Sequence, residues 1–286
     1  MQTILRSQQQ QVCIGSDSPF VVIGEKINPT GRKKLAQALQ TGDLGYVLEL
    51  ALAQVEAGAD VLDVNVGAPG VDEVALLPEV VKRLAATVQV PLCLDSPNRE
   101  ALAAALAVAP GKPLVNSVTG EQASLERVLP VIKEFGAAVI GLTLDDGGIP
   151  AEAEKRVSIA GKILERAARL GIPAEDVVID PLVLTVGADS KAGAVTLRTI
   201  ELIRREFGVN MNLGASNVSF GLPDRPTVNL AFLALGMGAG ATCAITDPVK
   251  LGPTIRAVDL LLGRDDYAAR YIGYWRGQQK KSEGVG

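Results

Sequence analysis

Polar side chains follow a series of short apolar runs along this chain, and their types are suited to binding a heterocycle. They are Glu25, Asp63, Asp95, Asn116, Thr143, Asp180, Ser216 and Thr246. A carboxylate accepts hydrogen bonds from two adjacent N–H groups of a ring, and an amide both donates and accepts. Gathered in one place, these side chains would form a hydrogen-bonding cup for a neutral heterocycle. The alternative is that some of them only cap the N-termini of the helices that follow.

The spacing of these residues predicts the fold. From Glu25 to Thr246 the chain advances 221 residues in seven steps, so the mean repeat is about 32 residues, the size of one strand–helix unit. Strands are expected at 20–23, 61–64, 91–94, 113–115, 138–142, 177–179, 211–213 and 242–245. Eight such units predict an α/β fold, a (β/α)8 TIM barrel whose site lies at the carboxyl ends of the strands. An open doubly wound sheet is the alternative, but GxGxxG is absent after the first strand.

The chain shows no composition break between these units. A single barrel domain is therefore expected over residues 19–276, with an N-terminal leader segment at 1–18 and a C-terminal tail at 277–286. The N-terminus is polar and lacks the apolar region of a signal peptide. The longest strongly apolar stretch, 101–109, is too short to span a bilayer. A cytoplasmic protein without membrane contact is expected.

Residue counts exclude several kinds of chemistry. The chain has no histidine, which excludes Ser–His triads, imidazole acid–base catalysis and histidine metal sites. Its three cysteines form no CxxC pair, so neither a disulfide framework nor a protein-bound metal is expected. The net charge is −4 and no basic block is present, which argues against nucleic-acid binding. Proton transfer must therefore use carboxylates, lysine, tyrosine, amide-ordered water or the substrate itself.

The strand-end segments resemble those of one family. They read GEKIN (24–28), LDVNVG (62–67), LCLDS (92–96), NS (116–117), IGLT (140–143), GIP (148–150), IDPL (179–182), SNVS (216–219), RP (225–226) and FLA (232–234). In this order they resemble the pterin-binding methyltransferases, which move a methyl group between methyltetrahydrofolate and a corrinoid (cobalamin-type) protein. The set is also similar to the folate module of cobalamin-dependent methionine synthase and, more distantly, to dihydropteroate synthase.

The resemblance implies roles for individual residues. The family's pterin contacts fall on Asp95, Asn116 and Asp180, and the amide near the methyl-bearing nitrogen falls on Asn217. Asn217 and Asp180 are accordingly the predicted catalytic residues. The predicted substrate-binding set is Asp95, Asn116, Asp180, Asn217, Ser216, Asn28, Asn65 and Asp63. Simpler readings stay open for some of them: Asn28, Asn65 and Asn217 suit turns, and Asp63 suits a buried structural acid.

The resemblance also implies a reaction and a partner. Co(I) attacks the N5-methyl group of methyltetrahydrofolate, and Asn217 stabilises N5 by hydrogen bonding as charge develops there. The chain is too short to include the zinc and cobalamin modules of methionine synthase, so a separate corrinoid protein is expected to dock transiently on a homodimer. Two alternatives are a dihydropteroate synthase-like condensation of a pterin pyrophosphate and a non-catalytic folate-binding protein.

Overall fold

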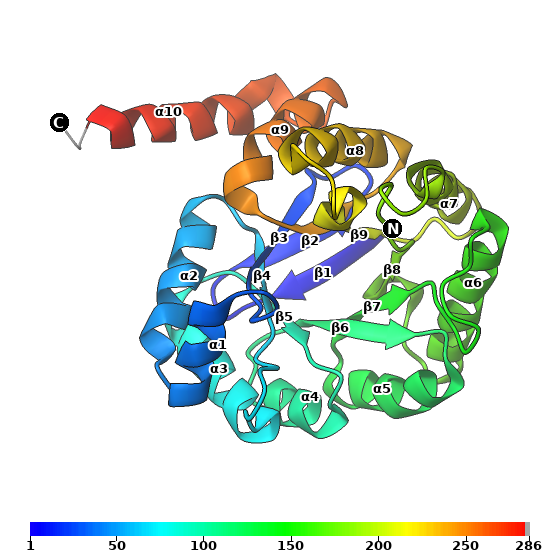
Figure 1. Ribbon diagram of the computed structural model, residues 1–286, viewed down its shortest axis with the longest axis horizontal. Coiled ribbons are helices and arrows are strands. Elements are labelled where there is room, and N and C mark those ends of the chain that lie inside the picture. The colour runs from blue at the N-terminus through cyan, green and yellow to red at the C-terminus, as the bar shows by residue number, and fades with distance from the viewer. Residues whose placement is uncertain (284–286) are drawn as a thin grey trace.

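Eight parallel strands form a barrel in the computed structural model, which describes residues 1–283 (Figure 1). The strands are β3 (Val21–Ile27), β4 (Val61–Val64), β5 (Leu92–Asp95), β6 (Leu114–Thr119), β7 (Ala138–Leu142), β8 (Val177–Asp180), β9 (Asn212–Gly214) and β10 (Cys243–Thr246). Their order is β8-β7-β6-β5-β4-β3-β10-β9, and a parallel bridge between Ile179 and Met211 closes the ring. The predicted TIM barrel is therefore confirmed, with a strand at each of the eight expected places.

Helices surround the barrel (Figure 1). They are α1 (Lys33–Thr41), α2 (Leu44–Glu56), α3 (Glu73–Thr87), α4 (Arg99–Leu106), α5 (Gln122–Phe135), α6 (Ala153–Arg169), α7 (Ala192–Glu206), α8 (Arg225–Ala239), α9 (Pro248–Leu261) and α10 (Ala269–Glu283). Each amphipathic helix buries one apolar face, as Leu77, Val81 and Leu84 do in α3. Short 3-10 turns are η1 (Ala174–Asp176), η2 (Ala215–Ser219) and η3 (Asp266–Ala268).

The N-cap residues of the helices test whether the strand-end residues serve as helix caps. Asp72, Asn98 and Asp247 occupy N-cap positions, where their side chains accept hydrogen bonds from backbone N–H groups of the first turn. None of the eight strand-end residues named above is an N-cap of the described helices. Helix capping therefore does not account for these residues, although the buried Thr143 hydroxyl is engaged with the Asp180 carbonyl oxygen at 3.0 Å.

A hairpin closes the amino end of the barrel. It consists of β1 (Gln2–Arg6) and β2 (Gln11–Gly15), which pair in antiparallel register. Leu5, Val12 and Ile14 from this hairpin are buried in one cluster with the inward-facing residues of the strands. The segment expected to be a leader thus forms the floor of the barrel, and the ligand side is the opposite end.

The C-terminal segment continues as helix. Residues 277–283, expected to belong to a tail, lie in α10, and residues 284–286 lie outside the described part of the chain. None of the helices in residues 1–283 combines the length and apolar character needed to cross a membrane.

Candidate active site at the mouth of the barrel

The strand periodicity directs the predicted residues into the barrel. Side chains two residues apart in a strand lie on the same face. Val61, Cys93, Leu114 and Val178 belong to the buried interior cluster. The residues two positions further along the same strands are Asp63, Asp95, Asn116 and Asp180, at the carboxyl ends of β4, β5, β6 and β8. These four polar side chains therefore form the layer above the apolar interior, at the end away from the hairpin.

Amides pair with the two carboxylates on β4 and β5. Asn116 Nδ2 donates a hydrogen bond to Asp63 Oδ1 at 3.2 Å, and Asn65 Nδ2 donates to Asp95 Oδ2 at 2.9 Å. Asp63 is buried, whereas Asp95 and Asn116 are half-buried. Each amide is thereby oriented, and Asp95 and Asn116 keep acceptor capacity for a ligand.

The third carboxylate is held by β9 and by the loop after β8. Asn212 Nδ2 donates to Asp180 Oδ2 at 2.7 Å, and the Leu182 backbone N–H donates to Oδ1 at 2.8 Å. Arg156 Nη1 donates to the carbonyl oxygens of Pro181 at 2.9 Å and Leu182 at 2.7 Å, which ties α6 to this loop. Asp180 is thus fixed from both sides, with one remaining lone pair on each oxygen.

Burial keeps these acids easy to protonate. Desolvation and then the negative charge of Asp95 raise the pKa of Asp63 well above its usual range. Burial also raises the pKa of Asp95, against the hydrogen bond from Asn65. Burial raises the pKa of Asp180 to about 6, although the bonds from Leu182 and Asn212 favour its ionised form. A ligand that brings N–H donors to these carboxylates would stabilise the ionised forms.

Asn217 and Ser216 lie in η2, directly after β9. The Asn217 side chain is exposed and makes no hydrogen bond within the described residues. Ser216 Oγ lies 3.3 Å from Glu25 Oε2 and donates a hydrogen bond to it. Burial raises the pKa of Glu25, which is opposed by the positive charges of Lys26 and Arg32. η2 thus presents one free amide and one engaged hydroxyl at the mouth.

The structure brings most of the predicted residues together and adds one. Asp63, Asn65, Asp95, Asn116 and Asp180 take part in the three hydrogen-bonded pairs described above. Asn28 Oδ1 accepts a hydrogen bond from the Thr30 backbone N–H at 3.0 Å. Asn65 Oδ1 accepts one from the Gly67 backbone N–H at 2.8 Å. Both side chains therefore also stabilise turns, which was the alternative role expected for them. Asn212 was not predicted; the signal for it was a polar residue inside the apolar strand of 211–213.

Within residues 1–283, no group of three cysteine, aspartate or glutamate side chains is arranged to hold a metal ion.

Comparison with known proteins identifies the class to which this site belongs. The model of a family described as pterin binding enzymes matches residues 24–247. The chain belongs to this family. It is 32% identical over 265 residues to a methylcorrinoid:tetrahydrofolate methyltransferase of Eubacterium limosum, which covers 90% of this chain and 96% of that protein. The predicted family and the prediction of a methyltransferase are confirmed by this relationship.

Other relatives share the barrel in different settings. The chain is 32% identical over 274 residues to methionine synthase of Mycobacterium tuberculosis, covering 88% of this chain but only 23% of that protein. Dihydropteroate synthase from Xanthomonas albilineans superimposes with a TM-score of 0.67 at 20% identity, over 91% of this chain and 98% of that one. Dihydropteroate synthase from Yersinia pestis gives a TM-score of 0.69 at 16% identity, over 91% and 99%. These two structures share the fold.

Proposed function

We propose that the protein transfers the N5-methyl group between methyltetrahydrofolate and the cobalt of a corrinoid carried by a separate protein. The observation that carries this proposal is the set of carboxylates and amides at β4, β5, β6, β8 and β9, which meet in hydrogen-bonded pairs at the mouth. The relationship to the Eubacterium limosum methyltransferase supplies the type of reaction.

The carboxylates and amides match the polar edge of a reduced pterin. That edge carries a 2-amino group, a ring N–H and a 4-oxo group. Asp95 and Asp180 accept from the N–H groups, and Asn116 adds an amide that can donate and accept. A buried donor left unpaired would cost about 1–3 kcal/mol, so the arrangement selects pterins over rings that lack these donors.

Asn217 is assigned the stabilisation of the leaving nitrogen. In the reaction, the bond between N5 and the methyl carbon breaks, the bond between cobalt and that carbon forms, and N5 gains a proton. The Asn217 amide donates to N5 as negative charge develops there and does not change its own protonation state. A preorganised donor of this kind is worth about 2.7–4 kcal/mol. The proton comes from solvent through water held near Asp180 or Ser216.

The assembly is part of the proposal. We propose a cytoplasmic homodimer that meets its corrinoid protein only transiently. Analytical ultracentrifugation of the isolated chain, and then of a mixture with the corrinoid protein, measures both states directly. A monomer in solution would contradict the first assignment, and a complex that stays intact on dilution would contradict the second.

Two measurements separate the proposed reaction from its alternatives. Calorimetry compares the binding of methyltetrahydrofolate with that of a pterin pyrophosphate, and a second assay follows methyl transfer to free Co(I) cobalamin. The proposal predicts binding of methyltetrahydrofolate and formation of methylcobalamin. Condensation of the pyrophosphate with p-aminobenzoate would favour the dihydropteroate synthase alternative. Binding of the folate without any methyl transfer would favour the non-catalytic alternative.

A further inference from the structure

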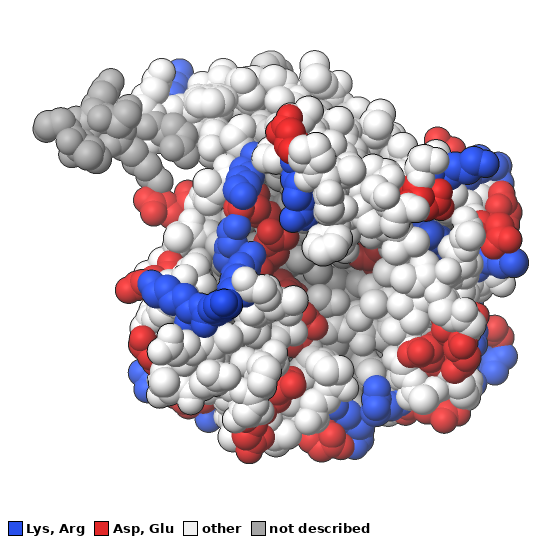
Figure 2. Space-filling view, in the orientation of Figure 1, with Lys and Arg blue, Asp and Glu red and all other residues white. Residues whose placement is uncertain are grey.

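A cavity of about 220 Å³ lies at the mouth beside the acidic layer, over the ends of β3, β9 and β10. Its polar lining consists of Glu25, Lys26, Arg32, Ser216, Arg225, Asn229, Asp247 and Lys250. Four of these side chains are basic and two are acidic, which leaves an excess of two positive charges. Lysine and arginine side chains gather on one part of the rim, with acidic side chains deeper in the hollow (Figure 2). We call this cavity the cationic pocket.

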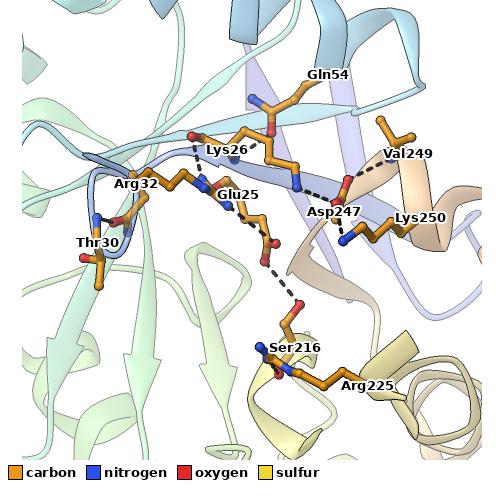
Figure 3. A network of polar contacts seen from close by, with 11 residues as sticks. Glu25, Lys26, Thr30, Arg32, Gln54, Ser216, Arg225, Asp247, Val249 and Lys250 are labelled. Atoms are coloured by element: carbon orange, nitrogen blue, oxygen red, sulfur yellow. Dashed lines mark hydrogen bonds and ion pairs between the residues drawn. The ribbon is translucent and has the colours of Figure 1, made fainter. Parts of the chain in front are cut away.

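Some of the positive charge in the cationic pocket is already paired. Lys26 Nζ forms an ion pair with the Asp247 carboxylate. Arg32 Nη1 donates to the backbone carbonyl oxygens of Glu25 at 2.8 Å and Lys26 at 2.6 Å (Figure 3). These contacts hold the turn after β3 and occupy donor groups of Lys26 and Arg32.

The remaining charge is available to a ligand. Lys250 Nζ lies 3.9 Å from Asp247 Oδ2, beyond hydrogen-bond distance, and the Lys250 side chain is 67% exposed (Figure 3). Asp247 is shared between Lys250 and Lys26, so it cannot neutralise both. Arg225 donates to the Ser216 carbonyl oxygen at 2.8 Å and to Ser219 Oγ at 3.1 Å, and its other N–H groups remain.

The lining of the cationic pocket also contains a residue with an unpaired acceptor. Asn229 lines the cationic pocket and is only 9% exposed. Its Oδ1 atom is buried and has no hydrogen-bond partner within the described residues. A buried acceptor without a donor costs about 1–3 kcal/mol, so a ligand N–H group that reaches this atom would be stabilising. A ligand for this pocket therefore needs carboxylates for the cations and an N–H group for Asn229.

We infer that the cationic pocket holds the glutamate chain of the folate. This inference rests on the proposed function, because the pterin ring must occupy the neighbouring acidic layer. The chain joins its glutamates through amide N–H groups and carries a free carboxylate on every residue, which is the combination that Lys250, Arg225 and Asn229 require. An inorganic phosphate would satisfy the cations but supplies fewer donors for Asn229. The mouth thus has an acidic side for the N–H-rich ring and a basic side for the acidic chain.

The two sides of the mouth are adjacent. Glu25, at the edge of the cationic pocket, is close enough for its charge to raise the pKa of Asp63 in the acidic layer. Their strands, β3 and β4, pair directly. A ligand that reaches from β4 and β5 toward β10 therefore crosses from one side to the other without leaving the barrel mouth.

The experiment compares three ligands by calorimetry. They are 5,6-dimethyltetrahydropterin, which has no chain, and methyltetrahydrofolate with one or with three glutamates. In the wild-type protein the triglutamate should bind about tenfold more tightly than the chainless pterin, and this difference should shrink at high salt because the charges are screened. Lys250→Glu should weaken the triglutamate about tenfold and leave the chainless pterin within about twofold. Lys82→Glu, the same charge change at an exposed position of α3, should change neither.

The outcomes separate this inference from the proposed function. Equal binding of all three ligands by the wild type would overturn the pocket assignment and leave the proposed function intact. An equal loss for every ligand in Lys250→Glu would overturn it as well, because the side chain would then act on the pterin or on the fold. Failure of all three ligands to bind the wild type would instead overturn the proposed function. Asn229→Leu provides a second test, with selective weakening of the glutamate-bearing ligands expected.

Discussion

Replacing Asp180 with asparagine should make the protein more stable at neutral pH while weakening folate binding. Burial raises the pKa of Asp180 from 3.8 to about 6. A difference of about two units corresponds to about 3 kcal/mol at 1.36 kcal/mol per unit. The folded state therefore loses about 3 kcal/mol of stability as pH rises from about 4 to about 6, because ionising this buried carboxyl is harder in the folded state than in the unfolded chain.

Asparagine has nearly the same shape and does not ionise. Its oxygen can still accept from the Leu182 N–H, and the Asn212 amide can rotate to offer its own oxygen to the new amide. Asp180→Asn should thus raise the free energy of unfolding by up to about 3 kcal/mol at pH 7.5, and the difference should vanish near pH 4, where the wild-type carboxyl is also neutral. Methyltetrahydrofolate binding should weaken, because one carboxylate oxygen is lost as an acceptor.

Urea unfolding of both proteins between pH 4 and 8 measures this directly. Asp17→Asn, at an exposed position near the hairpin, is the matched control and should show no pH-dependent gain. A gain of the same size at every pH would refute the ionisation argument. A loss of stability at pH 7.5 would show that the hydrogen bonds to Asp180 outweigh its burial.

Three further changes test other parts of the account. Asn217→Ala should leave the affinity for methyltetrahydrofolate nearly unchanged and lower methyl transfer by about 10²-fold or more, measured by calorimetry and single-turnover kinetics. Asn217→Asp, which keeps the shape but cannot donate, should do the same. Equal losses of binding and of transfer would argue against the role of Asn217 as a donor to N5. The dissociation constant of methyltetrahydrofolate should be flat above pH 7 and rise by up to about tenfold per unit below pH 6, because protonation turns one acceptor oxygen of Asp180 into an O–H donor that faces the N–H groups of the ring. A flat profile from pH 5 to 8 would contradict this. Leu5→Ala in the hairpin should lower the free energy of unfolding by about 2–5 kcal/mol, measured by thermal and urea unfolding. The methyl-transfer activity per folded molecule should stay unchanged. Loss of activity without loss of stability would assign the hairpin another role.

The barrel could be predicted because its strands are apolar on both faces. Inward residues such as Val61 and Val178 pack in the interior, outward residues pack under helices, and both leave the same short apolar run in the sequence. The site acids were predictable for the same reason, since Asp63 and Asp180 end such runs. The first barrel strand is an exception: β3 continues to Ile27, beyond the expected end at 23, because the polar Glu25 and Lys26 interrupt its apolar run.

Other features required the three-dimensional structure. The hairpin carries apolar residues at Leu5, Val12 and Ile14. Only their packing against the barrel interior explains why these positions are apolar. Asn212 lies within a strand of three residues, and its hydrogen bond to Asp180 depends on strands that are adjacent in space and 32 residues apart in sequence. Long-range pairings of this kind leave no local pattern.

The cationic pocket also depends on distant segments. Lys26, Arg225 and Lys250 come from the first strand of the barrel and from the last two helices that border it. Each looks like an ordinary surface residue in the sequence. Only the pairing of β10 with β3 on one side and with β9 on the other brings them to one cavity. Their chemistry follows from their grouping rather than from any short motif.

The most direct test of the central claim is a crystal structure of the protein with methyltetrahydrofolate. We expect the pterin at the mouth of the barrel, with its polar edge about 3 Å from Asp95, Asn116 and Asp180 and its methyl group facing solvent, where a corrinoid can reach it. A pterin bound outside the barrel mouth, or one whose methyl group points down toward the hairpin, would contradict the account.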